Sequence, residues 1–215
     1  MRKTFDAELA ELNEEMTAMA TAAQEAIDVV TESLTSGDEP TARRAVQIEG
    51  TLDQMERDIE NRCLRLLLRQ QPVARDLRTI SAAMKMVTDL QRIGDQAANI
   101  AEIAILLARG AQIHVPEDIS LMSRRAGFMV RQAIEAYTDR DTEMAAGVIN
   151  LDDEVDELFS RVKTELIGRI TANREDADET VDLIIIAKYL ERVADHAVNI
   201  ARWAVFCVTG QLAEA

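Results

Sequence analysis

The sequence has few of the residues that make turns and few of those that favour strands. Only 8 of its 215 residues are glycine, 3 are proline, and aromatic residues make up 3%. Sheet-rich folds need frequent turns and many β-branched or aromatic side chains. Ala, Leu, Ile, Val and Met instead carry the apolar content, which is 47% in all. These shortages predict a few long helices rather than many short strands.

Basic residues are also in short supply. Lys and Arg number 24 against 39 Asp and Glu, which gives a formal net charge of −15. Nucleic-acid binding depends largely on Lys and Arg that neutralise phosphates. An anionic membrane surface also repels an acidic chain. The charge therefore argues against binding to nucleic acid or directly to a membrane, and favours a basic partner surface or bound cations.

Long apolar runs are missing from the sequence as well. No stretch approaches the roughly 18 apolar residues that span a bilayer. The polar and acidic segment after Met1 does not have the pattern of a signal peptide. Cys63 and Cys207 lie in apolar helical stretches, where buried, reduced thiols are expected. We therefore expect a cytoplasmic protein.

Turn residues divide the chain into six expected helices. Apolar side chains recur at helical spacing, and a glycine, a proline or a short polar stretch separates each helix from the next. Asp38, Glu39 and Pro40 have the pattern of a helix start, an acidic cap followed by a proline in the first turn. The expected helices span about 5–36, 38–70, 72–110, 116–139 and 142–170, with a last helix after 176 that ends at Gly210.

The six helices form two similar sets of three. Residues 90–101 match residues 190–201, with Leu, Arg, Asp, Ala, Asn, Ile and Ala identical. Shorter matches in the preceding helices follow in the same order. Helicity alone explains repeated apolar positions, but not repeated polar identities at fixed offsets. Gly94, which stands opposite Ala194 in the repeat, indicates a close approach between helices.

Short loops between consecutive helices imply antiparallel neighbours. Each set of three helices can therefore fold back on itself as a bundle. We predict an all-α protein made of two tandem, internally repeated three-helix bundles, the first in residues 1–111 and the second in residues 112–215.

Acidic side chains recur on matching faces of the two halves. Residues three or four apart share one face of a helix. The stripes are Glu49 and Asp53 opposite Asp95 and Asn99 in the first half, and Asp152 and Asp156 opposite Glu191, Asp195 and Asn199 in the second. Gln91 stands where the first half would otherwise have the counterpart of Glu191. Gln91, Asn99 and Asn199 are possible accessory ligands.

Facing positions fall at matching heights. Counted from turns near Gln71 and Arg174 at ~1.5 Å per residue, partners lie within about 3 Å of one level. The pairs are Glu49 with Asp95, Asp53 with Gln91, Asp152 with Asp195, and Asp156 with Glu191. Like charges this close need a proton or a cation, and oxygen-rich clusters suit Mg²⁺, Mn²⁺, Ca²⁺ or iron. The second half, with four carboxylates, is the stronger candidate because an amide is a weak neutral ligand.

Two other interpretations of the stripes stay open. On a metal-free helical scaffold they would be solvated surface, or would be neutralised by Arg92 and Arg192. In a di-iron enzyme or metal store they would hold a redox centre, but that class needs Glu-x-x-His on two helices. The residues three before His114 and His196 are not acidic. No catalytic triad or phosphate-binding glycine loop is evident either, so we expect no enzyme activity.

Three segments together resemble the PhoU family of bacterial phosphate-regulatory proteins. They are residues 63–78, residues 90–101 and the repeat at 190–201, and the run from Gln71 to Arg78 is the most distinctive. The resemblance covers essentially the whole chain. It implies two tandem three-helix bundles whose acid-x-x-x-Asp motifs bind iron, zinc, magnesium or manganese. These motifs fall on Glu49/Asp53, Asp95, Asp152/Asp156 and Glu191/Asp195, with Gln91 as a departure from the family pattern.

The resemblance also implies a function. Such proteins restrain phosphate-starvation signalling when phosphate is plentiful. They act as adaptors between the ATPase of the phosphate ABC transporter and a membrane sensor histidine kinase, and many are homodimers. We therefore expect a negative regulator of phosphate uptake and of the starvation response, which meets the membrane only through its partners.

Overall fold

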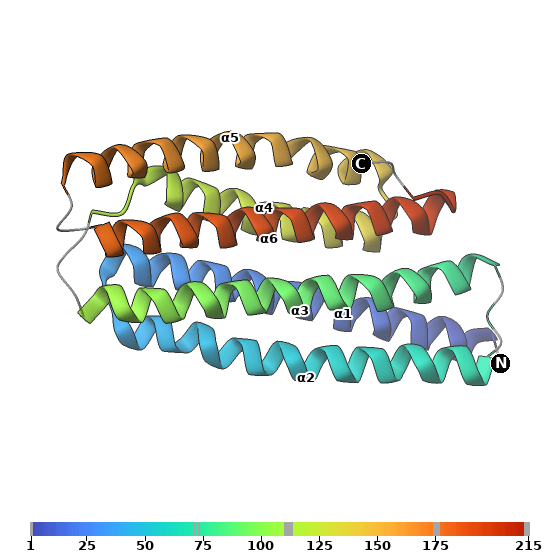
Figure 1. Ribbon diagram of the computed structural model, residues 1–215. Helices are drawn as coiled ribbons and strands as arrows, with labels where there is room; N and C mark the ends of the chain where they lie inside the picture. Colours follow the sequence, from blue (N-terminus) through green and yellow to red (C-terminus); the bar gives the residue numbers. More distant parts are fainter. Residues whose placement is uncertain (1, 71, 73, 110–113, 174–176, 213–215) are drawn as a thin grey trace.

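The computed structural model describes residues 2–70, 72, 74–109, 114–173 and 177–212, and in these ranges the chain forms six long helices (Figure 1). They are α1 (Arg2–Ser36), α2 (Glu39–Gln70), α3 (Ala74–Arg109), α4 (Glu117–Asp139), α5 (Thr142–Ala172) and α6 (Ala177–Thr209). The described ranges contain no strand, so the all-α prediction is confirmed. The expected turns near Gln71 and Arg174, and the expected boundary at 111/112, lie outside the described residues.

The helix ends follow their local sequence. Gly37 has φ 69, a left-handed conformation that glycine adopts without steric cost, and it ends α1. Asp38 then accepts a hydrogen bond from the Thr41 amide at 2.9 Å and caps α2, as the sequence predicts. Asp141 caps α5 in the same way, through the amides of Glu143 and Met144 at 2.9 Å.

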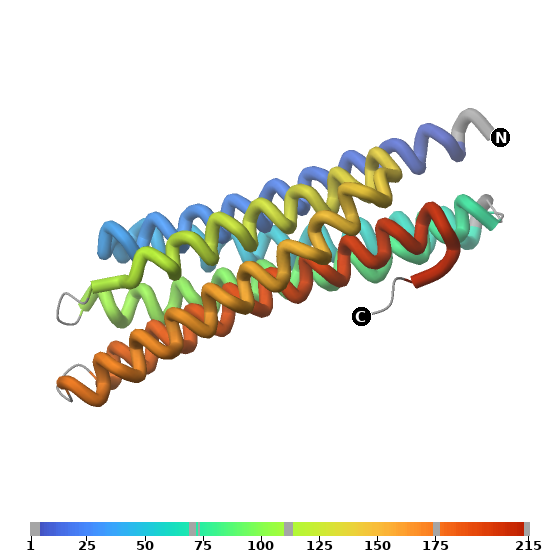
Figure 2. The backbone as a smooth tube through the Cα atoms, turned by 90° about the horizontal axis from the view of Figure 1, so that it is seen from above, coloured from blue at the N-terminus to red at the C-terminus, as the bar shows by residue number. Residues whose placement is uncertain are grey.

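Two three-helix bundles lie side by side. Helices α1, α2 and α3 pack against one another, as do α4, α5 and α6. The bundles meet along two helix pairs, α3 with α6 and α1 with α4. All six helices run along the length of an elongated molecule, and α2 and α5 lie on its opposite outer sides (Figures 1 and 2). None of the described helices is both long and apolar enough to cross a membrane.

The core is built from aliphatic and methionine side chains. Leu12, Met16, Met19 and Leu52 are among the largest fully buried residues. Cys63 and Cys207 are buried free thiols, as expected. Burial raises the pKa of each thiol to about 12, so both stay protonated at neutral pH.

Gly94 brings α3 close to α2. A Cβ added at this position would lie 2.5 Å from Cδ1 of Leu52, far inside contact distance. Leu52 directly precedes Asp53, and Gly94 directly precedes Asp95. The close approach that the repeat predicts therefore occurs at the level of the acidic stripes of the first half.

Candidate metal centre

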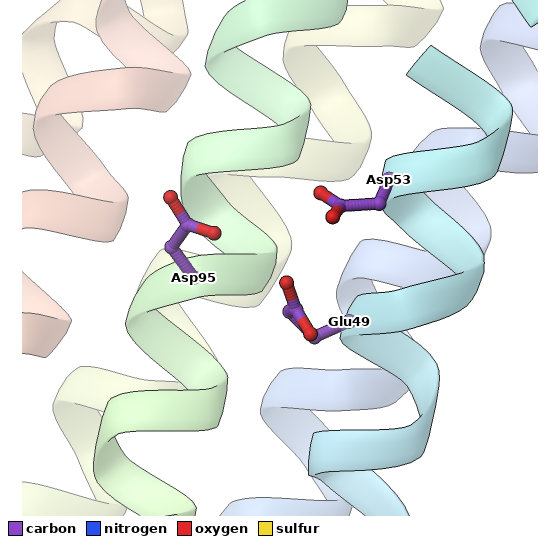
Figure 3. A group of neighbouring side chains, drawn as sticks. All are labelled: Glu49, Asp53 and Asp95. Carbon is purple, nitrogen blue, oxygen red and sulfur yellow. The ribbon is translucent and has the colours of Figure 1, made fainter. Parts of the chain in front are cut away.

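Three carboxylates of the first bundle converge between α2 and α3. One oxygen from each of Glu49, Asp53 and Asp95 lies within 4.8 Å of the other two. Asp95 projects from α3 toward the two acids on α2 (Figure 3). Ligand oxygens around a single Mg²⁺ or Ca²⁺ lie about 2.0–2.6 Å from the ion. Three oxygens this close together can therefore share one cation, and each side chain is half-buried.

Gln91 forms hydrogen bonds with two of these acids. Its amide Nε2 donates to Oδ1 of Asp53 at 3.0 Å and to Oδ1 of Asp95 at 2.7 Å. The predicted height of Gln91 opposite Asp53 is thus correct. In this arrangement the amide is a donor to the carboxylates, and its oxygen would ligate a cation only after the amide turns over. Arg92 pairs with Oδ2 of Asp95 at 3.2 Å, which is one of the neutralising contacts considered from the sequence.

The surroundings of Glu49 disfavour its ionisation. Burial raises the pKa of Glu49, and the negative charges of Asp53 and Asp95 add to the effect. A carboxylate with such neighbours is stabilised by a proton or by a cation. The donor set of three oxygens and its local charge fit a hard cation.

The acids of the second bundle face one another at the predicted heights. Burial raises the pKa of Asp152 to about 6, and among the neighbouring negative charges Asp195 adds most to this rise. The pKa of Asp156 is also raised, by burial first and then by the charge of Glu191. The pairs Asp152–Asp195 and Asp156–Glu191 are therefore present in the fold.

These four acids do not gather as tightly as those of the first bundle. In the described part of the chain, the Glu49–Asp53–Asp95 group is the one set of three whose ligand atoms all approach within 4.8 Å. Lys188, one turn before Glu191 on α6, forms an ion pair with it and also lies near the Phe159 ring. This lysine neutralises part of the second stripe. The expectation that the second half is the stronger site is not what the geometry favours.

Sequence reasoning overlooked Lys188, although a signal for it was present. Lysine three residues before a glutamate on one helix is a common ion-pair spacing. The corresponding position in the first half is Thr88, so the repeat does not draw attention to it. Two further cations border the second stripe, because Arg192 and Arg202 share a hollow of about 510 Å³ with Asp152 and Asp195.

The accessory asparagines and the histidine have different positions from the acids. Asn199 does not complete the acidic pair, because its amide points to Asp89 on α3, with Nδ2 3.4 Å from Oδ1. His196 Nδ1 lies 2.9 Å from the same Asp89 oxygen. Both contacts link the two bundles, which agrees with a structural role for His196. Asn99 is half-buried one turn beyond Asp95.

The fold and the site together define a class of protein: all-α proteins built from two tandem three-helix bundles, each with a pair of facing acidic stripes. A family model described as the PhoU domain matches residues 16–104 and again residues 119–204, one match in each bundle. The chain therefore belongs to the PhoU family.

Relatives match over nearly the full length. The chain is 34% identical to a protein of Clostridium acetobutylicum over 98% of this chain and 96% of the relative. It is 38% identical to one of Aquifex aeolicus over 95% and 93%. Both are named "Phosphate-specific transport system accessory protein PhoU homolog". The crystal structure of PhoU from Pseudomonas aeruginosa superimposes with a TM-score of 0.92 at 31% identity, covering 96% of this chain and 100% of that one.

Proposed function

We propose that this chain is an accessory protein of a phosphate-specific transport system and acts as a negative regulator of phosphate uptake and of the starvation response. The observation that carries this proposal is the similarity to proteins of that name over 95% or more of the chain. "Accessory" describes a role beside a transporter rather than catalysis, which supports a regulator without enzyme activity of its own.

The shape of the molecule supports an adaptor. The outer helices α2 and α5 lie on opposite sides, so each bundle has a long surface that the other does not cover (Figure 1). One surface docks on the ATPase of the transporter and another on a sensor histidine kinase. The net charge of −15 suits basic surfaces on such partners. In this proposal the protein works in the cytoplasm as a homodimer and reaches the membrane through its partners.

The carboxylate group binds a metal ion in this proposal. Glu49, Asp53 and Asp95 offer only oxygen ligands, which favours magnesium, manganese or iron over zinc. A cation held between α2 and α3 fixes the face of the first bundle that a partner meets. Asp152, Asp156, Glu191 and Asp195 form a second, weaker site, because Lys188 already pairs with Glu191.

The regulatory role is tested in the source organism. We expect that deletion of the gene raises alkaline phosphatase output and phosphate uptake in phosphate-rich medium, and that the wild-type gene on a plasmid restores both. A strain that carries Asp53→Asn shows whether regulation needs the metal group. Unchanged phosphatase output and uptake after deletion would contradict the proposed role.

Metal binding is tested on protein purified without an affinity tag. We expect Asp53→Asn to lose most of the bound metal, measured by elemental analysis, and Asp195→Asn to lose less. Glu14→Gln, a change of the same charge at an exposed position on α1, is the control and retains it. Equal metal content in wild type and Asp53→Asn would favour the metal-free scaffold. Redox turnover by the purified protein would instead favour the di-iron class.

Gln91→Glu sharpens the same test. A fourth carboxylate replaces an amide that now donates to Asp53 and Asp95, so repulsion replaces two hydrogen bonds in the metal-free protein. We expect the chelator-treated variant to lose about 1 kcal/mol of unfolding free energy. We also expect its affinity for Mn²⁺, measured by titration calorimetry, to rise about tenfold. An affinity equal to that of wild type would place the ion elsewhere.

A further inference from the structure

A second polar cluster lies where the two bundles meet, well away from the carboxylates. It combines the start of α3 with the end of α4, the α4–α5 turn and the end of α6. Arg140 reaches within 3.5 Å of the Thr79 hydroxyl, and the Cys207 thiol lies 3.9 Å from the Arg78 carbonyl oxygen. Arg78 precedes Asp95 by 17 residues on α3, which is about 25 Å along the helix. These elements lie toward the end of the molecule that carries the N-terminus (Figure 1).

The two arginines of this cluster have no acidic partner among the described residues. Acidic residues outnumber basic ones by 39 to 24, so an arginine in this chain has many carboxylates available. Neither Arg78 nor Arg140 forms an ion pair with a described carboxylate, and their charges act together on the Cys207 thiol. The cluster therefore holds two guanidinium groups that form no ion pair with a described carboxylate, in a protein with an excess of acids.

Buried donors within the cluster also have no partner in the described chain. The Nε atom of Arg78 is buried without a hydrogen bond, and so is the hydroxyl of Tyr137, a residue only 3% exposed. Burial raises the pKa of Tyr137, so the hydroxyl keeps its proton and remains a donor. Buried polar groups are normally paired, and each exception requires an explanation. Here the groups without a partner are donors, and they lie beside guanidinium groups that form no ion pair with a described carboxylate.

The backbone of Arg140 points to the same conclusion. Its φ of 59° and ψ of 37° place it in the left-handed region, where glycine is the usual residue at a helix C-terminus. An arginine there costs backbone strain that glycine would avoid. Strain of this kind is concentrated at functional positions. The strained backbone directs a guanidinium toward Thr79 on the other bundle.

We propose that this junction, formed by Arg78, Thr79, Tyr137 and Arg140, binds a small tetrahedral oxyanion with the chemistry of inorganic phosphate. A carboxylate typically pairs with a single guanidinium group through two parallel hydrogen bonds. A tetrahedral anion instead presents oxygens in several directions, which matches donors that come from α3, α4 and the α4–α5 turn. Because these donors belong to both bundles, the bound anion links them. The site does not use the carboxylate group, so it is independent of the proposed metal binding.

The test is equilibrium dialysis of the full chain with radiolabelled phosphate. The protein is first treated with a chelator, and chloride holds the ionic strength constant. We expect saturable binding of one phosphate per chain, with an affinity at least about tenfold lower in Arg140→Gly and in Arg78→Gln. Glycine suits the left-handed backbone at position 140, so that variant keeps the fold. Arg65→Gln, which removes an exposed arginine of α2, is the matched control and binds as wild type.

Competition identifies the class of ligand. Sulfate should displace the phosphate and acetate should not. Absence of saturable binding, unchanged binding by Arg140→Gly, or equal competition by acetate would each overturn the proposal. Loss of phosphate binding in Asp53→Asn would place the anion at the carboxylates and would overturn it too.

Tyr137→Phe gives a second readout that a purely structural hydroxyl would not give. The hydroxyl has no partner among the described residues. Its removal should therefore leave the melting temperature unchanged or higher without phosphate. Phosphate should raise the melting temperature of wild type by mass action, and should raise that of Tyr137→Phe less. An equal drop in melting temperature with and without phosphate would contradict the assignment.

Discussion

Corresponding residues of the repeat have different surroundings. Glu49 and Asp152 occupy matching positions, and burial raises the pKa of both. In the first bundle the amide of Gln91 donates to Asp53 on the opposite helix and to Asp95 on its own helix. In the second bundle Glu191 occupies that position and adds another negative charge, which Lys188 offsets. The difference between Gln91 and Glu191 therefore changes what stabilises the acids: hydrogen bonds from an amide in the first half, and the charge of Lys188 in the second.

Asp152 should make the metal-free protein less stable as pH rises. Its pKa of about 6 in the folded state is above the ordinary value of an aspartate, so folding favours the protonated form. The unfolding free energy should therefore fall between about pH 4 and pH 6. Asp152→Asn should flatten this dependence and add about 1 kcal/mol at pH 7, less than in a fully buried site because the group is partly solvated.

Urea titrations of chelator-treated protein at several pH values measure this effect. Glu14→Gln, at an exposed position on α1, is the control and should retain the wild-type slope. A slope in Asp152→Asn that matches wild type would show that another group is responsible.

At the scale of the elements, the contact between α2 and α3 is matched to its counterpart in the second bundle. Leu52 packs where Gly94 has no side chain. The repeat places Val155 and Ala194 at the corresponding positions. From the first half to the second, the larger residue of the pair shrinks from leucine to valine, and the smaller one grows from glycine to alanine. Total volume is what a core conserves, so both bundles keep their acidic stripes close.

Gly94→Ala should destabilise the first bundle. Its Cβ would contact the fully buried Leu52, and overpacking costs about 1–3 kcal/mol. The better helix propensity of alanine offsets about 1 kcal/mol. We expect a net loss of about 1 kcal/mol in urea unfolding and weaker metal retention, because α2 and α3 separate.

Leu52→Val added to Gly94→Ala reproduces the residue pair of the second bundle. The double variant should be more stable than the sum of the single changes predicts, because the two residues are in contact. Additive effects would show that the contact does not set the helix separation.

At the scale of the whole molecule, polar contacts across α3 and α6 help to hold the bundles together. Asp89 of α3 contacts both His196 and Asn199 of α6. Its counterpart in the repeat is Tyr189, so this contact occurs once rather than twice. The two bundles are similar in fold but are joined by an asymmetric interface.

Asp89→Ala should weaken the docking of the two bundles. The change leaves half-buried His196 and Asn199 without their acceptor, which costs about 1–3 kcal/mol. We expect a lower urea midpoint. We also expect the rate of amide hydrogen exchange to rise above that of wild type more in α3 and α6 than in α2 and α5. Asp89→Asn keeps an acceptor oxygen and should lower the urea midpoint less. Exchange rates identical to wild type in all helices would contradict a role for Asp89 in docking.

The sequence by itself determined the helices, the repeat and the pairing of the acids. Helical spacing and turn residues are local, so the bounds of α2 and the cap at Asp38 could be read directly. Antiparallel hairpins convert residue counts into heights, which placed Asp53 opposite Gln91 and Asp152 opposite Asp195. Gly94, which corresponds to Ala194 in the repeat, indicated a close approach between helices, and the structure shows that the partner is Leu52 of α2.

Only the tertiary structure decided which acids converge and what surrounds them. The counts predict height but not the direction of a side chain, so they favoured four acids of the second bundle over Glu49, Asp53 and Asp95. The junction of Arg78, Tyr137 and Arg140 joins residues from both bundles, and no periodicity relates them. Such residues come together only when the two bundles pack against each other. The contacts at that interface differ from one position to the next, so they leave no repeated pattern in the sequence.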